Sequence, residues 1–174
     1  MPAGDCVRID GRPDVINKRC RYGDLEGDTI VGKGRKSALV TLVDRKSGFV
    51  RLARVDSLKS ADVLRAAVRR LKDFPPSLRR SVTFDNGKEF AEHQKLAKQC
   101  DLKVYFAMPY RSWQRGTNEN TNGLIRQYFP KRTDFTRISH RAVARVEQLL
   151  NERPRRRLDY QTPAEVLSKR LRCN

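Results

Sequence analysis

The sequence predicts an α/β fold in which helices flank a mixed five-stranded sheet. Three β-branched or aliphatic runs follow one another early in the chain, at 25–32, 38–43 and 49–55, and tight turns separate them. Helical stripes then alternate with two further short strands, an order typical of parallel pairing in α/β proteins. At 38% hydrophobic residues, the 174-residue chain can form the core of one compact domain.

The first three strands are expected to form an antiparallel meander. LEGDTIVG (25–32) is short and β-branched, and ALVTLV (38–43) is apolar enough to lie inside a sheet. FVRLARV (49–55) alternates apolar with basic residues, as a half-exposed strand does. GKGRKS (32–37) and DRKSG (44–48) turn the chain. GKGRKS lacks the GxxxxGK[ST] spacing of a phosphate-binding loop, so it is better interpreted as a basic hairpin turn.

The middle of the chain predicts helix, strand, helix and strand. Ser60 is suited to cap a helix over 61–73, and the inward stripe of that helix would be Val63, Leu64, Ala67, Val68 and Leu71. SVTF (81–84) is a strand that leads directly into Asp85. Residues 89–99 suit a short helix, and LKVYFA (102–107) is the fifth strand, stopped by Pro109.

Three helices are predicted in the C-terminal third, over about 117–128, 139–152 and 163–171. The first would end at Pro130, and the side chains expected to pack inward are Leu124, Ile125, Tyr128 and Phe129, then Val143, Val146, Leu149 and Leu150. Residues 1–24 are polar and contain Gly11, Pro13 and Gly23. They predict an irregular arm before a core domain at 25–174.

The charge balance indicates a polyanionic partner. The chain has 38 Lys and Arg against 20 Asp and Glu, a formal net charge of +18. Such an excess favours nucleic acid, because bound counterions are released when basic side chains contact phosphates. A solubility feature or a ribosome-associated fragment is the alternative.

Composition also indicates the compartment. The four cysteines, at positions 6, 20, 100 and 173, have no metal-clip spacing, and the chain has only two histidines, so a structural zinc site is not expected. Scattered single cysteines fit reduced thiols. No apolar run reaches the roughly 18 residues of a membrane span, and the N-terminus lacks the apolar segment of a signal peptide. A soluble, cytoplasmic protein is expected.

Asp28 is the first candidate site residue, because it lies within an apolar β-branched run. Burying a carboxylate there costs free energy unless it is paired or binds a cation. The alternative is an exposed residue on an edge face. Glu26, two residues earlier, shares its strand face and is an auxiliary candidate or a decoy. Asp24 is expected to lie outside the strand and to be solvated.

Asp85 is the second candidate, at the carboxyl end of a predicted strand and before Asn86-Gly87. Sites in α/β sheets gather at this end of the strands, and the Asn-Gly turn would leave the carboxylate projecting. The alternative is an Asx-turn that only closes the strand.

Glu119 is the third candidate, on a predicted helix that places Asn122 and Arg126 on the same face. Gly123 would allow close approach of another backbone. A face of this composition cannot pack into a core, so it should contact solvent or a ligand. The alternative is an ordinary solvated helix face, although such faces usually carry Lys and Glu.

The three acids together suggest metal-dependent phosphodiester chemistry. Carboxylates from separate elements suit Mg²⁺ or Mn²⁺, and a pair of such ions can activate the attacking oxygen and stabilise the leaving one. Neither His93 nor His140 lies beside a plausible nucleophile in the sequence, and both are expected on helix surfaces. Trp113, between Arg111 and Arg115, could stack on a base or anchor its loop.

Five segments together resemble the catalytic core of bacterial insertion-sequence transposases of the IS-thirty family: EGDTIVG, ALVTLVDRKSGFVRLA, TFDNGKEFAEH, PYRSWQRGTNENTNGLIRQYFPK and NERPRRRLDYQTPAEVL. The likeness covers residues 12–168, about nine-tenths of the chain. It implies a DDE recombinase with a ribonuclease-H-like fold related to retroviral integrases.

The resemblance implies that Asp28, Asp85 and Glu119 are the DDE triad, and two Mg²⁺ or Mn²⁺ ions are expected at these three carboxylates. Thirty-three residues separate Asp85 from Glu119, a spacing typical of such enzymes. Arg126 matches the family's basic residue seven after the glutamate, which contacts DNA. Asp44 is a rival first acid, but the family pattern favours Asp28. The expected nucleic-acid contacts are Lys88, Arg111, Trp113, Arg115, Asn120, Asn122 and Arg126.

The resemblance predicts a transposase core that cleaves DNA and transfers strands, acting as a dimer or larger assembly on DNA. Two departures are Leu25, where the family usually has an aromatic residue, and the absence from residues 1–24 of the helix-turn-helix region of full-length relatives. The alternatives are a non-catalytic DNA-binding remnant that interferes with an intact transposase, and a ribonuclease acting on RNA–DNA hybrids.

Overall fold

A computed structural model of the chain describes residues 7–108 and 116–172. Within these residues the strands are β1 Asp24–Val31, β2 Ala38–Asp44, β3 Val50–Val55, β4 Ser81–Phe84 and β5 Lys103–Phe106. The helices are α1 Asp14–Asn17, α2 Ser60–Lys72, α3 His93–Cys100, α4 Gly116–Tyr128, α5 His140–Asn151 and α6 Pro163–Arg172. Short 3-10 turns connect several of them, including Lys88–Phe90 after β4 and Arg156–Leu158 before α6.

The described strands form one five-stranded sheet in the order β3-β2-β1-β4-β5. β1 pairs antiparallel with β2, and β2 with β3, whereas β4 is parallel to both β1 and β5. The predicted meander and the parallel pair are therefore confirmed. β1 is the central strand, as expected for the strand that carries Asp28.

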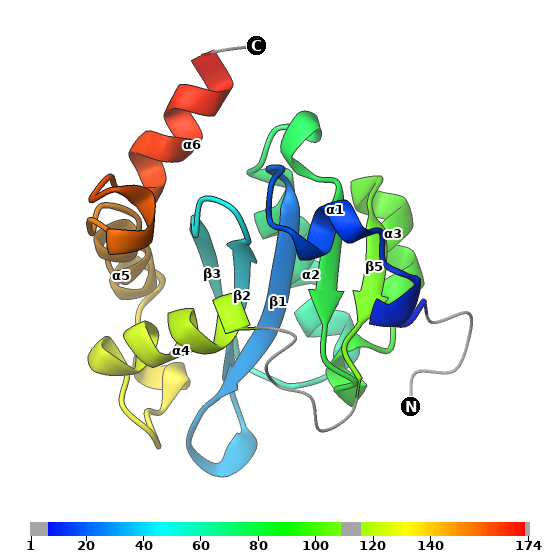
Figure 1. The fold of residues 1–174 in the computed structure, drawn as a ribbon. Helices are drawn as coiled ribbons and strands as arrows, with labels where there is room; N and C mark the ends of the chain where they lie inside the picture. The colour runs from blue at the N-terminus through cyan, green and yellow to red at the C-terminus, as the bar shows by residue number, and fades with distance from the viewer. Residues whose placement is uncertain (1–6, 109–115, 173–174) are drawn as a thin grey trace.

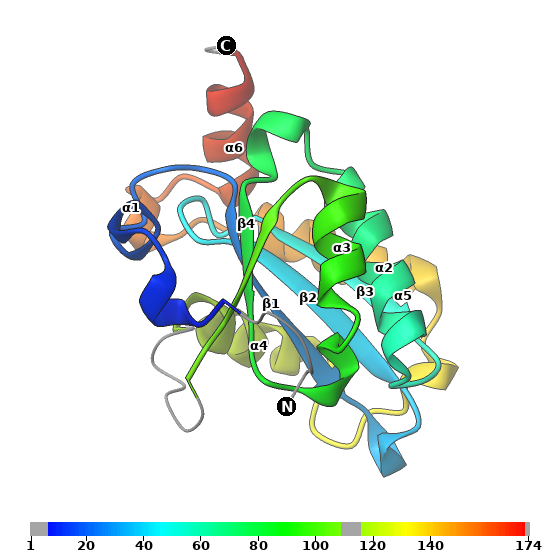
Figure 2. The same ribbon diagram turned by 90° about the vertical axis from the view of Figure 1, so that its right-hand side faces the viewer.

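Helices cover both faces of this sheet, as Figures 1 and 2 show from two directions. α2 and α3 pack on one face over a core that includes Leu42, Leu71 and Phe84. α4 and α5 pack on the other over a core that includes Leu39, Ile125 and Leu150. Along β1 the side chains alternate, so that Leu25 belongs to the first core and Ile30 to the second.

The N-terminal arm is more ordered than predicted. Ile9–Gly11 forms a 3-10 turn, α1 follows, and the side chains of Ile9 and Ile16 are buried. Arg12 is also buried and donates to Thr83 Oγ1 on β4 at 2.9 Å. Burial, with a smaller effect of nearby Arg45, lowers the pKa of Arg12 to about 10. The arm therefore packs onto the domain through these three side chains.

Several local expectations were wrong. Ser60 does not cap α2, because it is the first helical residue and its hydroxyl instead donates to Glu92 at 3.0 Å. Tyr128 is 39% exposed, although Ile125 in the same helix and Phe129 just after it are buried. Leu149 is only half-buried.

None of the described helices is both long and apolar enough to span a bilayer.

Candidate active site

Asp28, in the middle of β1, and Asp85, directly after β4, stand opposite one another in the register of these two strands. The parallel ladder between these strands ends at the pair Glu26 and Thr83, and each acid stands two residues beyond its strand's paired residue. Paired strands are about 4.8 Å apart, and residues two apart share a face. Both carboxylates are half-buried on the α4 side of the sheet. The structure thus brings the first two predicted acids together.

Helix α4 contacts this edge of the sheet through Asn122. Its amide Nδ2 donates to Asp28 Oδ2 at 2.9 Å, while the backbone N–H of Thr29 donates to Asp28 Oδ1 at 2.9 Å. These two bonds fix the orientation of the Asp28 carboxylate. Glu119 lies one helical turn before Asn122, and its side chain is exposed. The third predicted acid therefore stands on the helix that contacts Asp28.

Glu26 anchors the start of α4 rather than facing solvent. Its side chain is fully buried; Oε1 accepts from Arg45 Nε at 2.9 Å and Oε2 accepts the backbone N–H of Asn118 at 2.8 Å. The first-turn N–H groups of a helix have no partner within the helix, so a carboxylate here satisfies one of them and favours the helix dipole. Arg45 in turn donates to the carbonyl of Ile16. Glu26, which the sequence left as an auxiliary site residue or a decoy, therefore holds the start of α4 in position.

The turn after Asp85 has the predicted Asx geometry. The backbone N–H of Gly87 donates to Asp85 Oδ1 at 3.0 Å, and Asn86 Nδ2 donates to the carbonyl of Ala107 at 2.6 Å. The second bond ties this turn to the end of β5. The Asx-turn alternative is thus correct as local geometry, and it leaves the carboxylate at the strand end beside Asp28.

Glu89 is a fourth acid at this edge that the sequence interpretation missed. Thr29 Oγ1 donates to Glu89 Oε1 at 2.7 Å, which joins β1 to the turn after β4. A Cβ on Gly87 would lie 2.5 Å from Glu89 Oε2 and 2.9 Å from Asp85 Oδ1, so both carboxylates surround this glycine. The sequence signal was present in the motif DNGKEF, where Glu89 follows Asp85 by four residues.

The donor set fits a divalent cation, although the ligands are not gathered around one point. Among the described residues, no group of three His, Cys, Asp or Glu side chains is placed to hold a metal ion. However, the Asn122 amide oxygen is buried and has no hydrogen-bond partner, right beside Asp28. An unsatisfied oxygen beside the Asp28 carboxylate suits a hard cation. Asp28, Asp85 and Glu119 would hold such an ion.

The other predicted contacts are placed as follows. Lys88 is exposed on the turn after Asp85, and Asn120 is exposed next to Glu119. Arg126 is half-buried; its guanidinium donates to the carbonyls of Pro130 at 3.1 Å and Val31 at 3.3 Å, and burial lowers its pKa. Its contacts in this structure are those of a C-terminal cap for α4. Arg111, Trp113 and Arg115 lie outside the described residues.

Two expectations from the sequence were wrong, one for Asp24 and one for His93. Asp24 belongs to β1 and is buried, accepting from Arg21 Nε at 2.7 Å and from Ser81 Oγ at 2.6 Å. His93 is also buried, with its ring edge-on to Phe106. His140 is exposed, as predicted. The rival acid Asp44 is the last residue of β2 and is buried, and it accepts the N–H groups of Gly23 and Ser47.

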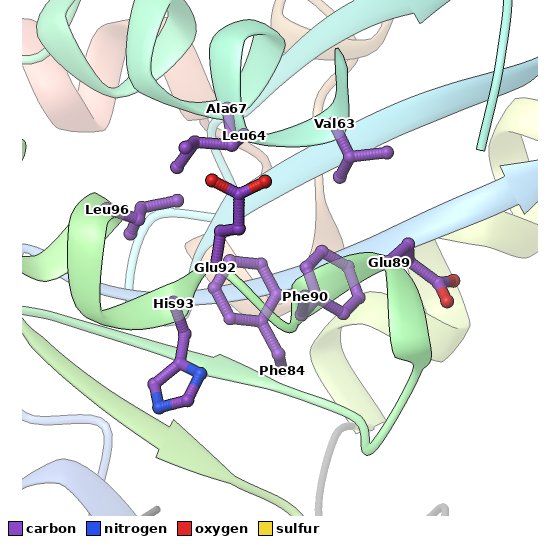
Figure 3. A pocket seen from close by; sticks show the side chains of 9 residues that line it. All are labelled: Val63, Leu64, Ala67, Phe84, Glu89, Phe90, Glu92, His93 and Leu96. Carbon is purple, nitrogen blue, oxygen red and sulfur yellow. The ribbon is translucent and has the colours of Figure 1, made fainter. Parts of the chain in front are cut away.

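A small apolar hollow lies on the opposite face of the sheet, between α2, α3 and the turn after β4 (Figure 3). Its lining includes Val63, Leu64 and the stacked rings of Phe84 and Phe90. Figure 3 shows the Glu89 carboxylate at its edge, pointing away from the rings. The hollow is therefore a gap in the packing behind the acids.

Comparison with known proteins agrees with this architecture. Residues 19–112 match the family model described as integrase core domain. The chain is 44% identical over 168 residues to the transposase for insertion sequence element IS4351 of Bacteroides fragilis, covering 97% of this chain and 51% of that one. It is 42% identical over 161 residues to the transposase InsI for insertion sequence element IS30A of Escherichia coli K12, covering 92% and 42%. The chain thus spans about half the length of the curated relatives it matches.

Solved structures confirm the predicted fold. The catalytic core domain of BIV integrase has a TM-score of 0.65 at 17% identity, covering 88% of this chain and 100% of that one. A chain of the simian T-cell lymphotropic virus intasome, solved with a PP2A regulatory subunit, has a TM-score of 0.60 at 20% identity, covering 75% and 50%. At these identities the likeness establishes the ribonuclease-H-like fold.

Proposed function

We propose that this chain catalyses divalent-metal-dependent cleavage of DNA and transfer of the cut strand. The chain belongs to the integrase core family and, within it, to the IS30-family transposases. The observation that carries this proposal is the register of the parallel strands β1 and β4, in which Asp28 and Asp85 each stand two residues beyond the last pair, Glu26 and Thr83. Glu119, on the helix bonded to Asp28, supplies the third carboxylate.

Both reactions are displacements at phosphorus. In cleavage, a water oxygen bonds to the phosphorus as the bridging 3′-oxygen leaves with its electron pair and takes up a proton. In strand transfer, that 3′-hydroxyl attacks a second phosphodiester, so each new P–O bond replaces one that breaks. A bound Mg²⁺ or Mn²⁺ supplies charge stabilisation for this exchange and lowers the pKa of the attacking oxygen.

The residues of the chain prepare the site in three ways. Thr29 and Asn122 orient the Asp28 carboxylate, and the Gly87 N–H orients that of Asp85. The buried Glu26 holds the first turn of α4 against β1, which sets the position of Glu119. Lys88, exposed three residues after Asp85, places a positive charge where a phosphate would enter. Asn120 is proposed as a polar contact to the same DNA, and a dimer or larger assembly on DNA is part of the proposal.

Nicking of a supercoiled plasmid tests the proposal, because it needs no knowledge of a terminal sequence. The parent chain should nick in the presence of Mn²⁺ or Mg²⁺ and not with chelator. Asp28→Asn, Asp85→Asn and Glu119→Gln, which keep side-chain shape, should each lose nicking by a factor of at least about 10² while unfolding like the parent. Normal nicking by any of these variants would reject that residue's assignment. DNA binding by a well-folded parent that never nicks would favour the non-catalytic alternative.

A further inference from the structure

Four arginines flank α4 from its first turn to its last, and are called here the basic strip: Arg19, Arg157, Arg155 and Arg153. At one end, Arg19 Nη2 lies 3.7 Å from the Cβ position of Gly116, where α4 begins. At the other, Arg153 Nη1 donates to Gln127 Oε1 at 3.1 Å in the last turn. Figure 1 places the segment between α5 and α6, which carries three of them, on the α4 side of the sheet. The 13-residue helix spans about 20 Å.

These arginines repel one another. Burial, followed by nearby Arg153 and Arg157, lowers the pKa of Arg155; burial, followed by Arg19, lowers that of Arg157. The buried Asp44 attracts Arg157 at longer range. Among the described residues, the salt bridges involve other cations and none of the four. Adjacent like charges without a paired carboxylate are unfavourable in the isolated chain, and a polyanion would relieve them.

The protein also holds two of these guanidinium groups in place. Arg155 Nη2 donates to the carbonyl of Leu150 at 3.0 Å, and Arg157 Nη1 donates to the carbonyl of Lys46 at 2.9 Å. Since a guanidinium carries five N–H groups, each bond leaves donors for a ligand. A fixed arginine loses less conformational entropy when it binds a phosphate. The strip is therefore arranged before any partner arrives.

Two exposed tyrosines accompany the strip. Tyr160 is 72% exposed, and both it and Asp159 adopt left-handed backbone conformations, with φ of 61° and 52°. Tyr128, at the end of α4, is 39% exposed and directly follows Gln127, which accepts the bond from Arg153. Arginines interleaved with exposed aromatic side chains are typical of nucleic-acid surfaces.

We propose that the basic strip binds the phosphate backbone of the DNA that leads away from the candidate active site. This proposal rests on the proposed function, since it extends the path of the same substrate. Phosphates follow one another at 3.4 Å along one strand of duplex DNA, so a strip of about 20 Å spans roughly six of them. An acidic protein segment would fit the charge, but the added tyrosines favour nucleic acid.

The test is the salt dependence of duplex binding without metal, in an Asp85→Asn background that cannot cleave. The strip variant is Arg19→Gln with Arg153→Gln and Arg157→Gln. A second, double variant is Arg19→Gln with Arg153→Gln. It keeps Arg157, whose bond to the Lys46 carbonyl makes it the strip arginine most needed for folding. The matched control removes three exposed charges from the opposite face, as Arg69→Gln, Lys72→Gln and Lys98→Gln. Thermal unfolding of all variants verifies that each is folded.

If the strip contacts phosphates, the slope of log affinity against log salt should shrink by about 0.9 for each lost contact. The reduction should thus approach about 2.7 for the triple variant and about 1.8 for the double, and the control should change it little. Equal effects of strip and control variants, or no effect of either, would overturn the proposal. A parent that binds through the strip but never nicks plasmid would reject only the proposed function. A nicking parent with normal strip variants would reject only the strip.

Discussion

The buried carboxylate of Glu26 accepts the backbone N–H of Asn118 at 2.8 Å, and so ties the helix that carries Glu119 to the strand that carries Asp28. The same carboxylate neutralises Arg45, itself 4% exposed. One side chain thereby satisfies a helix terminus and a buried cation together. Asn122, one turn further along α4, bonds to Asp28 itself, so the helix is joined to β1 at two successive turns.

Glu26→Gln should destabilise the fold by about 3–5 kcal/mol, because it leaves the Arg45 charge buried without its counterion. Urea unfolding at neutral pH measures this. Combining Glu26→Gln with Arg45→Met should recover part of the loss, because no buried charge is then left unpaired. A cost below about 0.5 kcal/mol, typical of a surface substitution, would show that the pair does not stabilise the fold.

Gly27→Ala should destabilise the sheet through a steric conflict. A Cβ at this position would lie 2.2 Å from Cε1 and 2.7 Å from Cδ1 of the Phe84 ring. Overpacking of this kind costs about 1–3 kcal/mol or more, read as a lower unfolding midpoint. Adding Phe84→Leu to Gly27→Ala should restore part of what the alanine removes. If the effects of the two substitutions on the free energy of unfolding are simply additive, contact with the Phe84 ring is not the cause of the destabilisation by Gly27→Ala.

Substitutions of Arg126 and Lys88 should have different effects, the first on stability and the second on DNA binding. Arg126→Ala removes a charged donor from the carbonyls of Pro130 and Val31 and should lower the unfolding free energy by about 1.5–3 kcal/mol. Lys88→Ala, at an exposed site, should leave stability unchanged and weaken duplex binding. Urea unfolding and binding isotherms are measured on both. An Arg126→Ala chain as stable as the parent would indicate that this arginine is kept for DNA alone.

Asp44 should give a pH-dependent difference in stability. Burial raises the pKa of its carboxyl, despite the bonds from Ser47 and Gly23 that act in the opposite direction. A raised pKa in the folded state means that its contribution to stability is present at low pH and is lost as pH rises through that pKa. The asparagine of Asp44→Asn does not titrate. The free energy of unfolding of this variant should therefore rise relative to that of the parent as the pH is raised from about 3 to about 7.

Unfolding of the parent and Asp44→Asn at both pH values provides the check on this sign. The amide loses one acceptor oxygen, which costs the same at each pH and cancels in the comparison. Other acids cancel as well, because both chains contain them. A difference that is constant with pH would contradict the raised pKa.

Local pattern was enough to predict the strands. ALVTLV and SVTF match β2 and β4 closely because an apolar, β-branched run between turns has few other options. The order of strands followed from the tight turns of the meander. The position of Asp85 was predictable for the same reason, since it directly follows β4.

What could not be predicted depends on partners distant in sequence. Asp24 appeared solvated because Ser81, which donates to it, is 57 residues away. Ser60 matched a capping pattern, yet its hydroxyl bonds to Glu92 on the segment before α3. The role of Glu26 required both Arg45 and residue 118, and that of Glu89 required Thr29. Burial of polar groups is set by tertiary contacts, which a local pattern does not contain.

The parallel pairing of β1 with β4 has a consequence during synthesis. Asp24 pairs with Ser81, and Asn122 returns to Asp28, so the parts of the site come from three widely separated stretches. Pairings of such high sequence separation form late and slowly. On the ribosome, the meander of β1, β2 and β3 emerges first, while β4 and α4 are still to be made. A nascent chain therefore holds Asp28 without Asp85 and Glu119 until β4 and α4 have been made.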